Sequence, residues 1–376
     1  MHVVQVSFFV DPERRSPSRL LEDWFSLSTI AEAVASTGVQ VTVIQASMVT
    51  ERIEQSGVRY HFVAPDREGK LLTKSATFPT LLRELSPDVL HVHGLGFARE
   101  VIELASLASR TPIFLQDHAD RVPRIWRRAT WRRGAAAAAG ISFCAQAQAE
   151  PFYRAGLLGR EVQIFEIPES TSPFVPGNAT AAREETGIYG DPAILFVSNL
   201  NQNKDPLTVL DGVGAAIVAL PGLQLWCCYV SAPLLSSVKT RVANDPALRD
   251  RVHLLGLVPH DRMEQHMRAS DLFVLGSRRE GSSFSLIEAL GTGLMPVVTD
   301  IPSLRALTAE GSVGELWECG NSTALTAALI RAASRPRSET RASVRAHFDA
   351  TLSPSALGRR FAAAYASLLP SRQDSA

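Results

Sequence analysis

Short apolar runs alternate with segments of helical apolar spacing along almost the whole sequence, and this alternation limits the fold more than any other feature. In the first half, strands are predicted over residues 3–10, 39–44, 58–64, 88–93, 112–115, 141–144 and 162–167. Intervening segments such as residues 18–36 and 97–107 have the spacing of amphipathic helices. Strands alternating with helices favour right-handed crossovers and a parallel sheet covered on both faces.

A second series of the same kind follows a segment rich in proline and glycine at residues 168–191. Its strands are predicted over residues 193–197, 223–230, 252–255, 272–275 and 295–299. A length of 376 residues suits two domains, and the intervening composition is typical of a linker. We predict a first domain of residues 1–175, a second of residues 176–352, and a helix within residues 353–376 that packs back on the first domain and ends in a frayed tail.

Composition narrows the class of protein. Apolar residues make up 45% and charged residues 20%, as in soluble globular proteins, and the formal net charge is zero, which gives no global field for nucleic acid. The N-terminus lacks the pattern of a signal peptide, and no apolar run approaches the ~20 residues that span a bilayer. The four cysteines match no zinc pattern, and two of them are adjacent, at Cys227 and Cys228. We therefore expect buried reduced thiols in a cytoplasmic protein.

The most informative local pattern is a pair of carboxylates, Glu280 and Glu288, around a turn of small residues. The turn follows a predicted buried strand and precedes a predicted helix over residues 284–290, which Ser282 or Ser283 can cap through its hydroxyl. A helix N-terminus after a strand offers N–H groups to a phosphate. Ionised carboxylates accept up to four hydrogen bonds and suit a ligand rich in hydroxyls. A sugar attached to a nucleotide diphosphate combines these features.

With its neighbours, this pattern resembles the GT4-type retaining glycosyltransferases, which have a GT-B fold. The similar segments are residues 194–205, 252–258, 269–277 and 280–293, with weaker echoes at residues 88–94 and 167–174. The resemblance implies two Rossmann-like doubly wound parallel-sheet domains facing an interdomain cleft. It also implies transfer of a sugar from a nucleotide diphosphate-sugar to an acceptor hydroxyl on a glycan, lipid or small molecule. The family needs no metal and no cofactor, and it retains the configuration of the sugar.

The resemblance also implies residue roles, which general chemistry supports. Lys204 would offset the charge of the diphosphate, Glu280 would orient the transferred sugar, and His118 would face the reacting sugar from the first domain. Glu288 would accept from the ribose hydroxyls. The remaining donor-binding candidates are Ser198, Asn199, Leu257, Gly281, Ser282, Ser283 and Phe284. The acceptor-side candidates are Arg14, Arg15, His93 and Asp117.

The chain departs from the family pattern where the diphosphate should bind. Asn199 stands where the family usually has an arginine that helps the lysine, and Arg278 or Arg279 could replace its charge. The loop after the first strand, residues 11–16, lacks the usual glycine pair, and its Arg14 and Arg15 could meet an anionic acceptor. These departures keep two alternatives open: a nucleotide-sugar epimerase or hydrolase on the same fold, and a non-catalytic subunit that binds a glycan or a partner.

Two other patterns have both a functional and a structural interpretation. Arg121–Arg133 contains six arginines and two tryptophans. It could contact an anionic surface at the inner face of the membrane or a phosphorylated acceptor, or it could form a solvated basic face. One short basic segment in a neutral protein does not predict a nucleic acid partner. His91 and His93 share one face of a strand, but no third ligand follows at useful spacing, so we predict no metal site.

Overall fold

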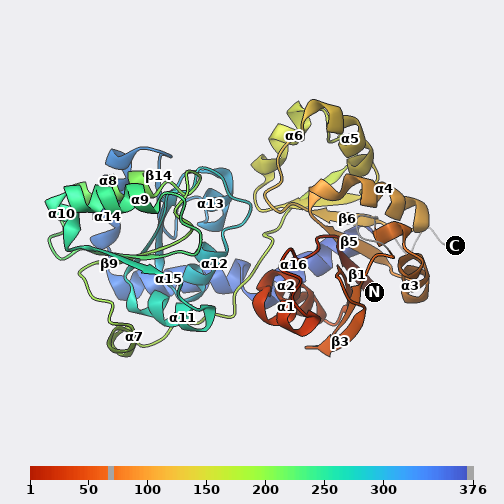
Figure 1. Cartoon of the computed structure of the whole chain (residues 1–376), viewed down its shortest axis with the longest axis horizontal. Helices are drawn as coiled ribbons and strands as arrows, with labels where there is room; N and C mark the ends of the chain where they lie inside the picture. The colour runs from red at the N-terminus through yellow and green to blue at the C-terminus, as the bar shows by residue number, and fades with distance from the viewer. Residues whose placement is uncertain (67–71, 371–376) are drawn as a thin grey trace. The chain divides into compact units, whose positions relative to one another are not determined.

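The computed structural model describes residues 1–66 and 72–370, and its chain forms two compact units (Figure 1). Unit 1 comprises Met1–Thr171 and Pro354–Ala376, and unit 2 comprises Ser172–Ser353. The chain therefore leaves the first unit, builds the second and returns to the first. Among the described residues, no helix has the length and apolar character needed to cross a membrane.

Unit 1 is built on an eight-stranded sheet with strand order β3-β4-β2-β1-β5-β6-β7-β8. All neighbours pair in parallel except β3 and β4, which are antiparallel. In the central register Val3 lies opposite Val41 on one side and Val89 on the other. The strands are β1 (His2–Ser7), β2 (Gln40–Ala46), β3 (Glu51–Gln55), β4 (Val58–Val63), β5 (Val89–His93), β6 (Ile113–Gln116), β7 (Gly140–Phe143) and β8 (Gln163–Glu166).

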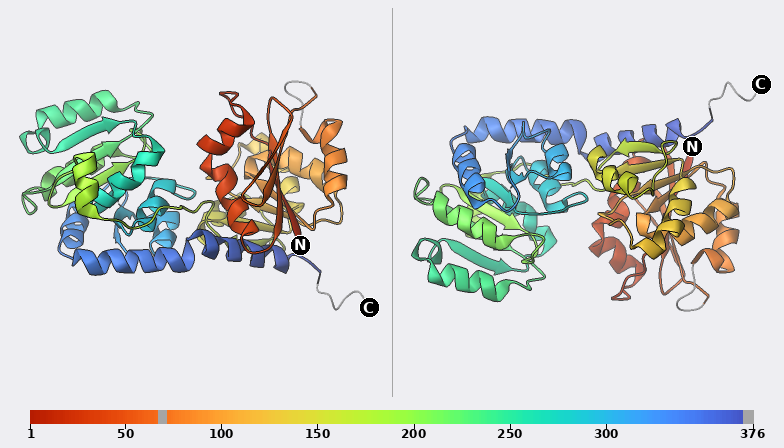
Figure 2. Two further views of the ribbon diagram at one scale, coloured as in Figure 1. Left: turned by 90° about the horizontal axis from the view of Figure 1, so that it is seen from below. Right: turned by 90° about the horizontal axis from the view of Figure 1, so that it is seen from above.

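Helices cover both faces of this sheet, as the two views of Figure 2 show. One face carries α1 (Pro17–Asp23), α2 (Phe25–Ala35) and α16 (Pro354–Ser367). The other carries α3 (Thr77–Leu85), α4 (Ala98–Leu107), α5 (Arg128–Ala136) and α6 (Glu150–Arg154). α16 lies directly on α2, because Gly358 has no side chain to collide with the Ala33 carbonyl. Phe361 and Tyr365 of α16 are fully buried, so the returning helix is part of this core.

Unit 2 contains a six-stranded sheet, entirely parallel, with strand order β11-β10-β9-β12-β13-β14. Its strands are β9 (Ala193–Val197), β10 (Gln224–Cys228), β11 (Val252–Gly256), β12 (Leu272–Leu275), β13 (Met295–Thr299) and β14 (Glu315–Trp317). Its helices are α7 (Ala179–Thr186), α8 (Pro206–Ala216), α9 (Leu235–Asn244), α10 (Pro246–Arg249), α11 (His260–Ala269), α12 (Phe284–Gly291), α13 (Pro302–Leu307), α14 (Ser322–Ala333) and α15 (Arg337–Thr351).

The structure confirms two α/β units with parallel sheets and differs from the sequence prediction in detail. β3 was not predicted, since its Glu-Arg-Ile-Glu-Gln sequence lies at the sheet edge and is largely exposed. The single helix predicted over residues 18–36 is two helices, because Trp24 leaves helical geometry at φ −104° and ψ 77°. The proline-rich segment also contains α7, which Asn178 caps and Gly187 ends in a left-handed conformation.

Candidate active site

Lys204 and Glu280 meet at the carboxyl ends of the unit 2 strands. Lys204 lies in the loop after β9 and Glu280 in the loop after β12, and the Lys204 ammonium forms an ion pair with Glu280 Oε1. Ser277 Oγ donates to the same oxygen over 2.6 Å. The Lys204 and Glu280 side chains are 20% and 11% exposed, so both reach the surface. A carboxylate and an ammonium held together in this way can bind hydroxyls and phosphate side by side.

The turn after Glu280 leads into α12 through Ser283. Ser283 is the N-cap residue, but its side chain makes no capping hydrogen bond, so the predicted role of that hydroxyl is not seen. The Ser283 hydroxyl therefore does not accept from the first-turn N–H groups of α12. These N–H groups carry the positive end of the helix dipole. Ser282 and Ser283 are buried and Phe284 is exposed. This geometry suits a phosphate bound by backbone N–H groups.

Glu288 lies one turn further along α12 and contacts a histidine that the sequence did not single out. Its Oε1 is 2.7 Å from Nε2 of His260, the first residue of α11. The His260 ring in turn lies 5.1 Å from the ring of Phe174. The carboxylate is thus held in place while it remains partly exposed.

Asn199, at the position of the usual arginine, and Arg278, one of the two candidates to replace its charge, both have partners within unit 2. Asn199 Oδ1 accepts from the Ser231 N–H over 3.0 Å, which joins the loop after β9 to the loop after β10. Arg278 donates to Asp205 over 2.6 Å. Arg278 is thus already paired with a carboxylate within unit 2. Leu257, in the loop after β11, is 69% exposed and open to a ligand.

In unit 1, His118 lies in a chain of polar side chains that begins with a glutamate. His118 Nδ1 is 2.6 Å from Glu169 Oε2, and its Nε2 is 3.2 Å from Nδ1 of His93. His93 Nε2 lies 3.4 Å from Gln5 Oε1. Glu169 was missed as a site residue, although it stands in the segment of residues 167–174 that resembles the family.

The pKa shifts define how protons are arranged in this chain. Burial, reinforced by the nearby His118 charge, lowers the pKa of His93 to about 3. Burial also acts against charge on His118, but its hydrogen bond to Glu169 and the surrounding carboxylates raise its pKa above 6.5. The distances then fit an imidazolium at His118 that donates to Glu169 and to His93. A neutral His93 donates onward to the Gln5 amide oxygen.

Asp117 precedes His118 and is buried beneath it in the loop after β6. Its carboxylate accepts from the N–H groups of Ala119 and Asp120 over 3.2 and 3.0 Å. Burial raises its pKa to about 7, and the charges of Asp120 and Glu169 add to the effect. Asp120 itself accepts from the Leu95 N–H over 2.7 Å, which links the loops after β5 and β6. Asp117, Asp120 and Glu169 are therefore close enough for the charge of one carboxylate to affect the protonation of another.

His118 and His93 line a cavity of about 520 Å³ within unit 1. Its apolar wall consists of Phe9, Trp24, Leu27 and Phe97, and its polar wall includes Asp120 and Arg127. Arg14 and Arg15 are absent from this lining. Arg15 instead pairs with Asp11 and Asp23 over 3.4 and 3.5 Å. The cavity has the mixed character of a site for an amphipathic or aromatic small molecule.

The histidine pair considered for a metal has a different environment. His91 is fully buried, and its Nδ1 is 2.7 Å from the Tyr365 hydroxyl. Its ring stacks on His93 with centroids 4.4 Å apart. Among the described residues, no group of three or more His, Cys, Asp and Glu side chains could hold a metal ion. These contacts give His91 a place in the packing between the sheet and α16.

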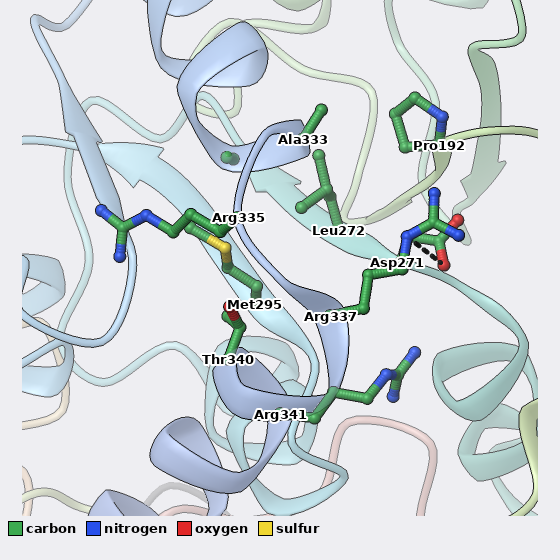
Figure 3. Close-up of a pocket in the computed structure, with 10 residues that line it drawn as sticks. Pro192, Asp271, Leu272, Met295, Ala333, Arg335, Arg337, Thr340 and Arg341 are labelled. Atoms are coloured by element: carbon green, nitrogen blue, oxygen red, sulfur yellow. Dashed lines mark ion pairs between the residues drawn. The ribbon is translucent and has the colours of Figure 1, made fainter.

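A separate hollow lies at the opposite end of the unit 2 sheet, by the amino ends of β9, β12 and β13 (Figure 3). Its volume of about 10 Å³ has room for roughly one water molecule. Arg337 lies 3.5 Å from Asp271 there, and Arg335 pairs with Glu315. This hollow is too small for a sugar or a nucleotide, so the candidate site stays at the carboxyl ends of the strands.

Two parallel-sheet units, each with its polar cluster at the carboxyl ends of the strands, define a GT-B architecture. Solved structures share it over the full chain. A sucrose-phosphate synthase from Thermosynechococcus elongatus is 17% identical with a TM-score of 0.71, and 98% of each chain is covered. The HepE protein of Anabaena, solved in complex with UDP, is 17% identical with a TM-score of 0.73, and 98% of this chain and 100% of that chain are covered.

Family models assign the two halves separately. The model described as a glycosyl transferase 4-like domain matches residues 26–168, and that of the glycosyl transferases group 1 matches residues 191–335. The chain therefore belongs to the GT4-type glycosyltransferases of GT-B fold.

Curated relatives match over part of their length. A GDP-mannose:cellobiosyl-diphosphopolyprenol alpha-mannosyltransferase of Xanthomonas campestris is 23% identical over 61% of this chain and 60% of its own length. A D-inositol 3-phosphate glycosyltransferase of Geodermatophilus obscurus is 29% identical over 47% of this chain and 41% of its own length. The matches thus cover less than two thirds of either relative.

Proposed function

We propose that this protein transfers a sugar, with retention of configuration, from a nucleotide diphosphate-sugar to an acceptor hydroxyl. The observation that carries the proposal is the cluster of Lys204, Glu280 and Ser277 beside the N-terminus of α12. It places a cation, a carboxylate and backbone N–H groups at the carboxyl ends of parallel strands, where ligands of such sheets bind.

In this proposal the donor replaces contacts that unit 2 now makes within itself. The diphosphate takes the Lys204 ammonium and the first-turn N–H groups of α12, and Glu280 accepts from hydroxyls of the transferred sugar. Glu288 accepts from the ribose, and exposed Leu257 packs against the base. Positive charge from a lysine and a helix end stabilises the departing diphosphate without a metal ion, because both act where negative charge develops.

Retention of configuration follows from the face of the sugar on which we place the attack. Departure of the diphosphate leaves an oxocarbenium-like sugar, and the acceptor hydroxyl attacks from the face that the diphosphate leaves. The departing phosphate oxygen takes the hydroxyl proton, so no protein nucleophile is needed. The enzyme contributes position and electrostatic stabilisation. His118, with a raised pKa, supplies a positive charge and a donor on the unit 1 side.

We assign the acceptor to the unit 1 cavity. Its aromatic wall suits an apolar or ring-bearing portion of the acceptor, and Arg127 suits a phosphate. The names of the relatives support this chemistry, since one acts on a diphosphopolyprenol-linked sugar and another on inositol 3-phosphate. We place this activity in the cytoplasm, where nucleotide-sugars are made and used.

The test is a thermal-shift panel of UDP-, GDP- and ADP-sugars with and without EDTA. The matching donor at a hundred times its Kd should stabilise the protein by about 2.7 kcal/mol, and EDTA should leave this shift unchanged. Lys204→Met should abolish the shift, whereas Lys239→Met, an exposed lysine on α9, should not. A shift that needs a divalent metal contradicts metal independence. The absence of any shift contradicts the donor site.

One observation favours a second candidate, a GT-B subunit that binds without catalysis. Asn199 occupies the position of a usual cation and is held by Ser231, so the diphosphate site has less positive charge than is typical. A protein that binds a nucleotide-sugar but neither transfers nor hydrolyses it would support this alternative. Epimerised sugar after incubation without acceptor would instead indicate an epimerase.

A further inference from the structure

We infer that the segment Arg121–Arg133 of unit 1 is a docking surface for an anionic lipid bilayer, with Ile125 and Trp126 as its inserting residues. The two tryptophans of this segment, Trp126 and Trp131, differ in burial. Trp131 is buried on α5, and its ring stacks on Phe152 with centroids 6.3 Å apart. Trp126 is 72% exposed, and its neighbour Ile125 is 77% exposed. The core of unit 1 therefore uses one tryptophan and leaves the other to solvent beside a second large apolar residue.

The exposed pair Ile125 and Trp126 lies in a turn that is continuous with a packed helix. Ile125–Arg127 forms a 3-10 turn that runs directly into α5. α5 lies against α4, where Gly134 allows a close approach to Ala98. Figure 1 shows α4 and α5 side by side in unit 1. A rigid turn presents its side chains outward without the entropy cost of ordering a loose loop on binding.

The charged residues within the segment Arg121–Arg133 all have one sign. Six arginines and no acidic residue lie between positions 121 and 133. Five of these arginines are exposed, and within the described chain none of the six forms an ion pair. Arg124 lies over the Trp126 ring, with its guanidinium carbon 5.3 Å from the ring centroid. Elsewhere in the protein, exposed arginines such as Arg154 and Arg262 are paired with glutamates.

This combination identifies the partner by its chemistry. Tryptophan favours the level of lipid headgroups, and arginine side chains near it are attracted to anionic headgroups. An exposed isoleucine adds apolar area that only a bilayer or a protein groove can bury. Nucleic acid would use the arginines and could stack on Trp126, but it offers nothing to Ile125. An anionic bilayer satisfies all three kinds of side chain.

The surface also connects to the cavity of unit 1 through Arg127, which belongs to the segment and lines the cavity. A lipid-linked acceptor held in the bilayer could therefore present its phosphate at Arg127 and its sugar at His118. This last step rests on the proposed function, whereas docking on the bilayer does not.

The test is co-sedimentation of the full chain with vesicles of phosphatidylcholine alone or with about 30 mol% phosphatidylglycerol, at about 0.1 M salt. We expect binding to the anionic vesicles only. The double variant I125S/W126S should weaken it at least tenfold, since both side chains lose apolar burial. R121Q/R124Q/R133Q should weaken it by roughly fivefold per charge removed. V218S is the matched control, because Val218 of unit 2 is 90% exposed but has no charged neighbour in sequence, and it should bind as the wild type does.

A spectroscopic measurement identifies the inserting residue. Brominated phosphatidylcholine mixed into the anionic vesicles should quench part of the tryptophan fluorescence, and W126F should remove that part. The inference is overturned if anionic vesicles do not bind, if I125S/W126S binds as tightly as wild type, or if a DNA oligonucleotide binds with the same dependence on both residues.

Failure of this inference and failure of the proposed function are separable. I125S/W126S should keep the thermal shift with the matching nucleotide-sugar, because neither residue lines the cavity or belongs to unit 2. Vesicle binding without any nucleotide-sugar shift would leave the docking surface standing and remove the donor site. A thermal shift with a nucleotide-sugar but no vesicle binding would support the donor site and remove the docking surface.

Discussion

The two units have the same kind of fold but hold their polar clusters in different ways. Unit 2 arranges charges as opposite pairs, with Lys204 on Glu280 and Arg278 on Asp205. Unit 1 concentrates Asp117, Asp120 and Glu169 around His118 and buries most of the group. In unit 2 each of these charges has a partner of opposite sign before a ligand binds. In unit 1 the carboxyl groups outnumber the cation, so the net charge of the cluster depends on which groups are protonated.

This difference suggests a division of labour. A ligand that carries both hydroxyls and phosphates can replace the partners within such an ion pair, because it offers each charge a new partner. A buried cluster of like charges cannot exchange partners so easily, and it responds to pH instead. We therefore expect substitutions in unit 2 to act on donor chemistry and substitutions in unit 1 to act through protonation.

The largest effect is expected from Glu280→Ala. It should lower the kcat of transfer by about 10²–10³-fold, because the sugar loses the carboxylate that orients it. Nucleotide diphosphate affinity should stay the same or rise, since Lys204 is released from its ion pair. Kinetics and calorimetry on one preparation would show both changes, with Glu184→Ala on α7 as the exposed control. Equal losses in kcat and in nucleotide affinity would mean that the pair acts as one structural unit.

The candidate donor residues of unit 2 could be proposed from the sequence because most of them belong to one short segment. Glu280, the small turn and Glu288 occupy nine consecutive positions, and Lys204 follows a strand with a clear apolar pattern. Most strands of both sheets were likewise visible as short apolar runs. β14 and β3 were not, since one has only three residues and the other is a polar edge strand whose pairing depends on β4.

The partners of these residues were harder to predict, because contacts between distant positions leave no local pattern. Glu169 lies 51 positions from His118, and only folding brings the two side chains within 2.6 Å. Arg278 and Asp205 likewise lie 73 positions apart, and no local pattern indicates their ion pair. Trp131 meets the core from α5, whereas Trp126 lies exposed in the 3-10 turn before it, and no local pattern shows which of the two is buried.

A smaller effect, on stability, is expected from Asp117→Asn. The pKa of Asp117 is about 7 in the folded chain, whereas an Asp outside a folded structure has an ordinary pKa of 3.8, so between these values the folded state binds more protons. Wild-type stability therefore falls as pH rises through this window. An asparagine has no charge to bury, so the stability of the variant lacks this pH dependence. The difference in free energy of unfolding, variant minus wild type, should therefore increase by roughly 2–4 kcal/mol from about pH 4 to pH 8.

Chemical denaturation of the two proteins at several pH values would measure this gain. Asp250→Asn, an exposed position in unit 2, should show no such dependence. A constant difference between the Asp117 variant and wild type would show that Asp117 is already charged throughout, and the contrast between the units would lose its main support.

The finest test of the contrast is Glu169→Gln, which keeps the shape of the side chain and removes its charge. Glu169 raises the pKa of His118 against the effect of burial, so the variant should lower that pKa. If the His118 imidazolium assists transfer, the alkaline limb of kcat/KM should move toward acid, and activity at the pH of the wild-type limb should fall. NMR titration of the His118 ring would follow the same shift directly. Glu161→Gln, an exposed residue just before β8, is the matched control. A uniform loss of activity with an unchanged pH profile would make Glu169 a purely structural partner of His118.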